Sequence, residues 1–221
     1  MSSKDSIFKF IICGTDTDIG KTLISSFFVR GLNSFYWKPI QSGIETQTDS
    51  QTVASLAKVS RDKIIKEAYI FTKPLSPHWA SEIDQKTINF DMLRIPKVKG
   101  SLIVETAGGL MVPLTRDFLQ IDQIKQWDLP VILVCKSSLG TLNHTLLSIE
   151  ALKLRNIEIL GLVVNGEKHL DNPKTLVEFS GIPLITEFPY IKKIDSNNFD
   201  ILWKELDIKN KLVSLLNSKI S

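Results

Sequence analysis

Residues 7–22 read Ile-Phe-Lys-Phe-Ile-Ile-Cys-Gly-Thr-Asp-Thr-Asp-Ile-Gly-Lys-Thr, an apolar run that leads into a glycine-containing loop. Apolar residues at helical spacing follow at once, from Leu23 to Phe28. A strand, a tight loop, Gly-Lys-Thr and a helix in this order bind nucleotide phosphates through backbone N–H groups and the helix N-terminus. The stretch therefore predicts a phosphate-binding loop.

The side chains of this loop have separate expected tasks. Lys21 is expected to reach the outer phosphates, and the Thr22 hydroxyl is expected to bind Mg²⁺. Five residues separate Gly14 from Gly20, where the strict pattern has four, so that Thr15 holds the place of the first glycine. The prediction depends on the Gly-Lys-Thr half of the motif and on the rest of the chain.

Composition indicates an ordinary soluble α/β protein. The 221 residues are 43% hydrophobic and 23% charged, with a formal net charge of +3 and no basic block. We therefore expect one ligand-binding domain over residues 1–221, with no nucleic-acid partner and no membrane partner. The polar start and the absence of a long apolar stretch favour a cytoplasmic location. Cys13 and Cys135 each end an apolar run and are expected to be reduced core residues.

Continuous apolar runs predict buried strands at 7–13, 35–37, 101–105, 130–135, 157–164 and 183–185. Helices are predicted after Gly20, within 46–58, near 89–94 and over 140–153, whereas residues 71–77 are expected to be extended or turned. Strands that are apolar throughout are buried on both faces, so the pattern predicts a doubly wound, mostly parallel sheet flanked by helices. Ligands bind at the carboxyl ends of such strands, where Lys38, Glu105, Gly140 and Asn165 lie.

Three charged residues are candidates for chemistry. Glu105 closes a strand and precedes Ala-Gly-Gly, which allows close approach of a ligand, although a strand-end acid can also face solvent. Asp49 in the first turn of a helix could bind a metal or only favour the helix dipole. Lys38 ends a buried strand, where a cation is costly unless it faces an anion.

Other polar residues leave alternatives open. The helix start at 140–143 could bind a second anion or be an ordinary turn. Ser42, in an expected loop, could supply a hydroxyl, and His78 has no evident carboxylate partner and could be structural or line a substrate site. The three histidines lack metal-ligand spacing, and the four tryptophans are expected to pack in the core.

Several motifs together resemble those of the dethiobiotin synthetase family. They are Gly-Thr-Asp-Thr-Asp-Ile-Gly-Lys-Thr at 14–22, Lys-Pro-Ile-Gln-Ser-Gly at 38–43, Thr-Asp-Ser at 48–50, Pro-Leu-Ser-Pro-His at 74–78, Val-Glu-Thr-Ala-Gly-Gly at 104–109, Leu-Gly-Thr-Leu-Asn-His at 139–144 and Val-Asn-Gly at 164–166. The resemblance spans residues 8–191. It implies a P-loop NTPase-like fold and an ATP- and Mg²⁺-dependent ligase of biotin biosynthesis. The implied reaction joins 7,8-diaminononanoate and CO₂ into dethiobiotin and releases ADP and phosphate.

The resemblance also implies roles for individual residues and a homodimer with its active site at the interface. Lys38 and Lys21 would be catalytic, and Thr22, Asp49 and Glu105 would bind Mg²⁺. The residues that would contact ATP are Asp18, Ile19, Gly20, Lys21, Thr22, Leu23, Asp49, Glu105, Thr106, Ala107, Gly108, Asn165, Gly166, Pro189, Tyr190 and Ile191. The residues that would contact the diamine are Thr17, Ser42, Gly140, Thr141, Leu142 and Asn143. The last four of these would come from the neighbouring subunit.

Two positions depart from the family pattern. Thr106 stands where family members often have glycine, and Ser138 stands where they often have a basic residue. The rival interpretations are another phosphate-loop enzyme, such as an amidotransferase-type synthase domain or a partitioning ATPase, and a non-enzymatic regulatory module. Asp16 occupies the place where partitioning ATPases usually carry a lysine. Lys38, Asp49 and Glu105 together argue against a passive binder.

Overall fold

The computed structural model describes residues 6–44, 46–192 and 194–217. Their main sheet has seven parallel strands in the order β4-β2-β6-β1-β7-β8-β9. The strands are β1 (Lys9–Gly14), β2 (Phe35–Trp37), β4 (Ile64–Ile65), β6 (Leu102–Glu105), β7 (Val131–Lys136), β8 (Ile159–Asn165) and β9 (Leu184–Phe188). The central strands are buried except for a terminal lysine in β1 and in β7, which confirms the predicted doubly wound parallel sheet.

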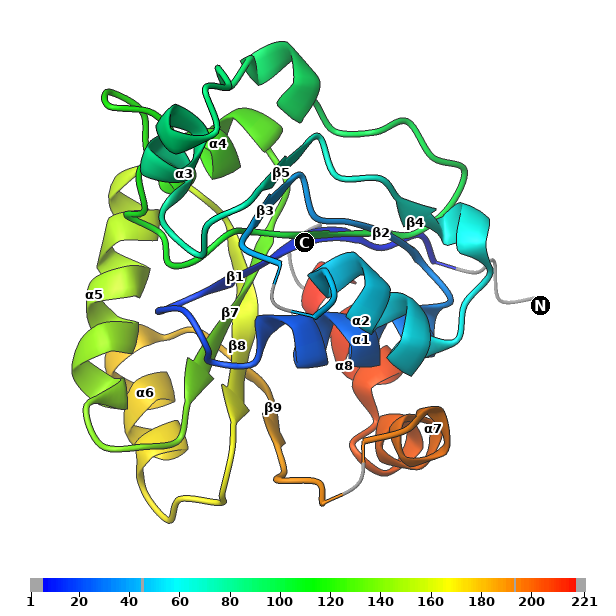
Figure 1. Ribbon diagram of the computed structural model, residues 1–221. Helices are drawn as coiled ribbons and strands as arrows, with labels where there is room; N and C mark the ends of the chain where they lie inside the picture. Colours follow the sequence, from blue (N-terminus) through cyan, green and yellow to red (C-terminus); the bar gives the residue numbers. More distant parts are fainter. Residues whose placement is uncertain (1–5, 45, 193, 218–221) are drawn as a thin grey trace.

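Helices cover both faces of this sheet (Figure 1). One face packs against α1 (Lys21–Leu32), α2 (Asp49–Ala57), α7 (Ser196–Glu205) and α8 (Ile208–Asn217). The other face packs against α4 (Gln120–Trp127), α5 (Thr141–Leu154) and α6 (Asn172–Ser180). In the part of the chain described, no helix is both long enough and apolar enough to cross a membrane.

Side-chain alternation along β1 divides the core in two. Phe10 and Ile12 join the cluster under α1, whereas Ile11 and Cys13 join the cluster under α5. Both cysteines are free and buried, as predicted, and burial raises the pKa of the Cys13 thiol to about 12. Under α1, Phe27 contacts four aromatic rings edge-on, those of Phe28, Phe188, Phe199 and Trp203. This aromatic contact anchors α1, and therefore the loop before it, to the sheet.

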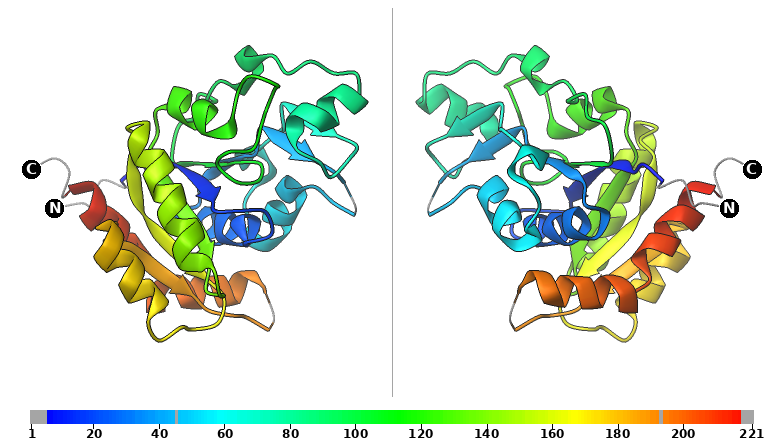
Figure 2. Two further views of the ribbon diagram at one scale, coloured as in Figure 1. Left: turned by 90° about the vertical axis from the view of Figure 1, so that its left-hand side faces the viewer. Right: turned by 90° about the vertical axis from the view of Figure 1, so that its right-hand side faces the viewer.

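A smaller unit lies above one end of the sheet, at the opposite end of the molecule from α7 (Figure 2). It contains a second parallel pair, β3 (Ile40–Ser42) and β5 (Tyr69–Phe71), with α3 (Pro77–Ile83). Of the two 3₁₀ turns, η1 (Arg61–Lys63) lies between β3 and β5 along the chain, just before β4, and η2 (Phe90–Leu93) follows α3. A separate small core that includes Ile40, Phe71 and Ala80 holds it together.

This unit is where the sequence-based expectations differ most from the structure. Ser42 lies in a strand and not in a loop, and the helix expected near 89–94 is a short 3₁₀ turn. α3 was not predicted, because Pro77 was interpreted as a breaker, although proline is well tolerated in the first turn of a helix. α4 was also missed. Trp79 on α3 is 51% exposed, so the expectation that it packs in the core is wrong.

Candidate functional site

The carboxyl ends of β1, β2 and β6 meet at one edge of the sheet. Ile12 pairs with Glu105, and Trp37 pairs with Val104. Lys38, just after β2, and Glu105, the last residue of β6, therefore lie at the same level of the sheet. The chain order reverses beside β1, which has β6 on one side and β7 on the other. In open parallel sheets this switch point is where ligands bind.

The phosphate loop connects β1 to α1 at this edge. Gly20 caps α1 with a φ of +92°, in the left-handed region that favours glycine. Lys21 is the first helical residue, and its Nζ donates to the carbonyl oxygen of Asp16 across the loop at 2.6 Å. The Asn165 side chain, from the end of β8, donates to the carbonyl oxygen of Ile19 at 2.8 Å. The loop is therefore fixed by one bond within itself and by one bond from the end of β8.

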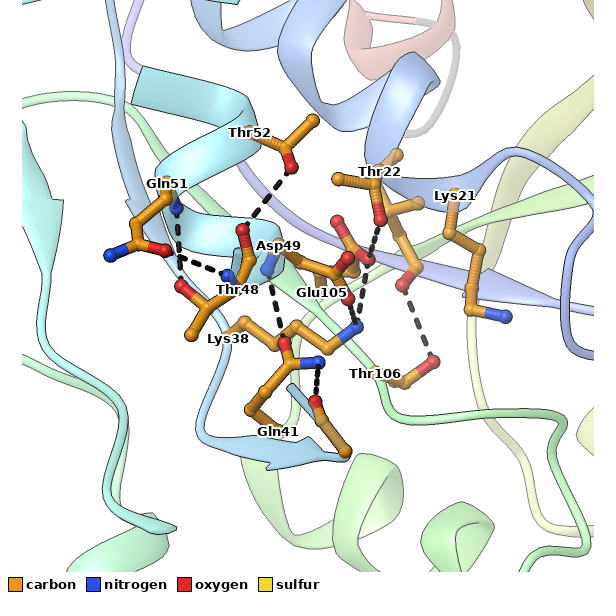
Figure 3. Close-up of polar contacts among 12 residues, drawn as sticks. Lys21, Thr22, Lys38, Gln41, Thr48, Asp49, Gln51, Thr52, Glu105 and Thr106 are labelled. Carbon is orange, nitrogen blue, oxygen red and sulfur yellow. Dashed lines mark hydrogen bonds and ion pairs between the residues drawn. The ribbon is translucent and has the colours of Figure 1, made fainter. Parts of the chain in front are cut away.

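Burial sets the electrostatics of Lys21. The residue is buried, with 7% exposure, and loss of hydration lowers the pKa of its ammonium, an effect that the Glu105 carboxylate partly offsets. Figure 3 shows the Lys21 side chain directed away from the cluster formed by Lys38, Asp49 and Glu105. An anion beside the loop would compensate this poorly solvated cation.

Lys38 lies between the two candidate metal acids. Its Nζ donates to the Asp49 carboxylate and to Oε1 of Glu105, the latter at 3.1 Å (Figure 3). Burial by itself lowers the pKa of this ammonium, but the attraction of Glu105 and Asp49 outweighs burial and leaves the pKa above its ordinary value. Lys38 is thus a fully charged group at neutral pH.

Glu105 is the most deeply buried charged side chain of the site, with 0% exposure. Its Oε1 accepts from the Thr22 hydroxyl at 2.8 Å and from Lys38. Its Oε2 accepts from the hydroxyl of Tyr36 at 2.9 Å. Both oxygens of a carboxylate that cannot reach bulk water therefore have donors.

The N-terminus of α2 holds Asp49. Thr48 caps this helix in a reciprocal capping box with Gln51, which confirms the predicted helix start. Gln41 Oε1 accepts from the backbone N–H of Asp49 at 3.1 Å, and Gln41 Nε2 donates to the carbonyl oxygen of Gly43 at 3.1 Å. No role was predicted for Gln41 from the sequence, although its polar side chain next to the apolar Ile40 was a signal that this position faces polar groups.

These groups surround a cavity of about 830 Å³. Eleven of the sequence-predicted residues line it: Thr17, Asp18, Gly20, Lys21, Thr22, Lys38, Ser42, Asp49, Glu105, Ala107 and Gly108. The Ser42 hydroxyl is buried without a partner in the described residues. The cavity wall also includes Gln41, Gln47, Thr52, Val112 and the segment 74–77, which were not among the predicted site residues.

The other predicted residues lie outside this cavity. Ile19 and Leu23 pack into the core beneath the loop, and Thr106 is buried, with its N–H donating to the carbonyl oxygen of Ile12 at 3.1 Å. The Thr106 side chain therefore does not project into the cavity. His78 lies beside the wall and shares a hydrogen bond with Ser76 through Nδ1.

Two further groups of predicted residues lie along the same sheet edge. Gly166 and the segment 189–191 follow β8 and β9, next to the far side of the phosphate loop. Residues 140–143 open α5 after β7, with Gly140 at a φ of +91° and Ser138 exposed in the preceding turn. None of these residues lines the cavity.

Oxygen donors at the cavity suit a hard cation such as Mg²⁺. The Thr22 hydroxyl and the Glu105 carboxylate are in contact, and Lys38 links both candidate acids. The described residues contain no metal-binding group of three or more His, Cys, Asp or Glu side chains. The donor set therefore fits an ion that completes its coordination with phosphate oxygens and water.

The chain has close curated relatives. A family model described as an AAA domain matches residues 9–198. The ATP-dependent dethiobiotin synthetase of Brucella anthropi is 47% identical over 186 residues, which cover 84% of this chain and 88% of that protein. The enzyme of the same name from Rhodopseudomonas palustris strain HaA2 is 42% identical (85% and 88% covered), and that of Agrobacterium fabrum is 41% identical (84% and 88% covered).

Solved structures show the fold at much lower identity. A structure of pNOB8 ParA bound to nonspecific DNA matches with a TM-score of 0.54 and 14% identity, covering 96% of this chain and 99% of that one. A putative plasmid partition protein from Borrelia burgdorferi B31 bound to AMPPNP matches with a TM-score of 0.50 and 12% identity, covering 97% and 100%. This likeness shows the P-loop NTPase-like architecture alone.

Gly20→Ala is expected to weaken nucleotide binding. A Cβ at this position would lie 2.1 Å from Nδ2 of Asn165, which would force that amide away from Ile19. We expect at least a tenfold loss of ADP affinity, about 1.4 kcal/mol, by isothermal titration calorimetry. Gly181→Ala is the matched control, because Gly181 also has a positive φ but no atom within 4 Å of the added Cβ. Equal ADP affinities of the two variants would contradict the expectation.

Proposed function

The chain belongs to the ATP-dependent dethiobiotin synthetase family, and we propose that the cavity between the phosphate loop, Lys38 and Glu105 is its active site. The protein is an ATP-dependent ligase of biotin biosynthesis that makes dethiobiotin. The observation that carries the site assignment is the convergence of Lys38, Asp49, Thr22 and Glu105 beside the phosphate loop. Relatives at 40–47% identity favour this ligase over the partitioning ATPases, which share only the fold.

In the proposed reaction, one amine of 7,8-diaminononanoate adds to CO₂ and loses a proton, which gives a carbamate. A carbamate oxygen then bonds to the γ-phosphorus of ATP as the β–γ P–O bond breaks and ADP leaves. The second amine bonds to the carbonyl carbon of the mixed anhydride, phosphate leaves with the C–O bond electrons, and the amine proton is released. The product is a cyclic urea.

The nucleotide end of this reaction is assigned to the phosphate loop. We propose that the loop N–H groups and Lys21 hold the phosphates, because they stand at a helix N-terminus with a buried cation. Asn165, Gly166 and the segment 189–191 would contact the adenine from the neighbouring strand ends. Asp18, Leu23 and residues 106–108 would complete the ATP contacts.

The end of the cavity that would hold the diamine, whose carbamate accepts the phosphoryl group, is assigned to Lys38 and the β3–β5 pair. Lys38 is charged and in hydrogen-bonding reach of the two acids, so a short movement would bring its ammonium to a carbamate or γ-phosphate oxygen. Thr17 and Ser42 line the cavity and would orient the diamine, and the buried Ser42 hydroxyl has no partner among the described residues. Phosphoryl transfer depends on such positioning and charge neutralisation.

Mg²⁺ is the proposed metal, and Thr22, Asp49 and Glu105 are the residues that would hold it. When bound, it would neutralise charge on the transferring phosphoryl group. The fit rests on the hydroxyl and carboxylate oxygens that already meet at this point. We also propose that the chain acts as one ligase domain and works in the cytoplasm, where ATP is available and buried thiols such as Cys13 stay reduced.

We propose a homodimer in which α5 of one subunit completes the site of the other. Residues 140–143 lie outside the cavity of their own chain, which fits a role in a partner's site. Leu139, Leu147 and Leu154 are exposed in the turn before α5 and along it, at 104%, 57% and 79%. Large apolar side chains gathered on one element are typical of a subunit interface.

ATP turnover is expected to require both the diamine and bicarbonate as the source of CO₂. A ligase couples phosphoryl transfer to the carbamate, so omission of either substrate should reduce ADP release to a small fraction of the complete rate. A coupled ADP-release assay with each substrate omitted in turn measures this. Hydrolysis at the complete rate without the diamine would sink the ligase assignment and favour a regulatory ATPase.

Lys38→Ala is expected to lower kcat by about 10²–10³-fold, because it removes a positive charge from the transferring group. ADP affinity should change little, since the phosphates are held mainly by the loop. Steady-state kinetics and calorimetry separate the two effects. Lys73→Ala serves as a control lysine on the exposed surface. Unchanged turnover in Lys38→Ala would remove Lys38 from the mechanism.

Leu147→Asp is expected to convert the dimer to a monomer and to lower turnover, because it places a charge in the proposed α5 interface. Sedimentation velocity and the ADP-release assay measure both effects. Leu170→Asp is the control, since Leu170 is 96% exposed in the loop before α6 and outside the proposed interface. A monomeric wild-type protein with full activity would rule out the shared site.

A further inference from the structure

We propose that Tyr36, which touches neither cavity nor solvent, positions the Glu105 carboxylate for metal binding. This inference rests on the proposed metal role of Glu105 and deepens it. Tyr36 does not line the cavity and has 0% exposure, so it is a positioning residue and not a catalytic one. Its one polar atom, the phenolic oxygen, lies 2.9 Å from Oε2 of Glu105.

Strand alternation places the Tyr36 ring on the correct side of the sheet. In β2 the neighbours Phe35 and Trp37 pack toward the α4 side, whereas Tyr36 joins the core under α1 and α2. β2 lies next to β6, and Tyr36 pairs with Ile103, two residues before Glu105. Residues two apart on a strand share a face, so the hydroxyl approaches the carboxylate from within the core.

The two carboxylate oxygens of Glu105 accept hydrogen bonds from different donors. Thr22 and Lys38, which both line the cavity, donate to Oε1. Among the residues that the structure describes, Tyr36 is the one donor to Oε2, and it does not line the cavity. A carboxylate held through Oε2 cannot rotate about its terminal torsion without breaking this bond. Oε1 is thereby directed toward the place where Thr22 and a metal would meet.

A buried carboxylate needs this partner more than an exposed one would. Glu105 cannot replace a lost donor with bulk water, so removal of the hydroxyl leaves Oε2 desolvated and free to turn toward Lys38 or Thr22. Groups that orient metal ligands through a hydrogen bond typically change metal affinity by about 10–100-fold when they are removed. The same order of effect is expected here.

Tyr36→Phe tests the inference, because it keeps the ring in the core and removes only the hydroxyl. ADP binding to the full chain is measured by calorimetry with Mg²⁺ and with EDTA. We expect metal-free ADP affinity to stay within about twofold, which also shows that the variant is folded, and the gain in affinity from Mg²⁺ to fall by about tenfold or more. The KM for Mg²⁺ should rise in parallel, with kcat largely recovered at saturating Mg²⁺.

Two further variants make the outcomes distinct. Tyr69→Phe is the matched control, since the Tyr69 hydroxyl accepts from the exposed N–H of Asn89 and lies away from Glu105; its Mg²⁺ dependence should be that of the wild type. Glu105→Gln should abolish the gain from Mg²⁺. If Glu105→Gln loses that gain and Tyr36→Phe keeps it, Tyr36 has only a packing role and the inference is overturned. If Glu105→Gln also keeps the gain, the proposed metal site itself is wrong.

Discussion

The burial of Glu105 is the constraint on which the rest of the site depends. A carboxylate without access to water is stable only if every oxygen has a donor and the charge has a partner. The Glu105 carboxylate is hydrogen-bonded to the start of α1 through Thr22, to the end of β2 through Lys38 and to the core through Tyr36. One acid at the end of β6 thus ties together three segments that are distant in sequence.

Asp49 belongs to the same network but is held in a different way. Lys38 connects it to Glu105, while Gln41 and the Thr48 cap fix the helix that carries it. The proposed nucleotide side of the cavity is formed by the main sheet, and the proposed diamine side includes the β3–β5 pair. Lys38 lies between β2 and β3 and contacts acids from β6 and from α2. This arrangement suits a reaction that must bring a carbamate to a γ-phosphate.

The sequence predicted the main sheet well because its signals were local. Each of its signals can be recognised within a few consecutive residues. These signals are the apolar runs, the Gly-Lys-Thr turn and the strand-end residues Lys38 and Glu105. Tyr36 could not be found in this way, since it acts on Glu105, which lies far along the chain. Gln41 had a local signal, its polar side chain between Ile40 and Ser42, but its contact with the N–H of Asp49 across a turn was not evident from the sequence. The β3–β5 pair and α3 were not predicted, because short strands and a helix that begins with proline have sequences like those of loops. The roles of residues 140–143 and 189–191 rest on the resemblance and stay predictions.

The second parallel pair has an evolutionary consequence. Ser42 and the 74–77 wall belong to a unit with its own small core around Phe71, whereas the phosphate loop is anchored by the aromatic contacts of Phe27 in the main core. Substitutions in the smaller unit can reshape the proposed diamine pocket without disturbing the packing that holds the phosphate loop. In such a scaffold the substrate preference can change during evolution while the nucleotide chemistry is retained. Laboratory selection for activity on other diamines would therefore begin with substitutions in the smaller unit.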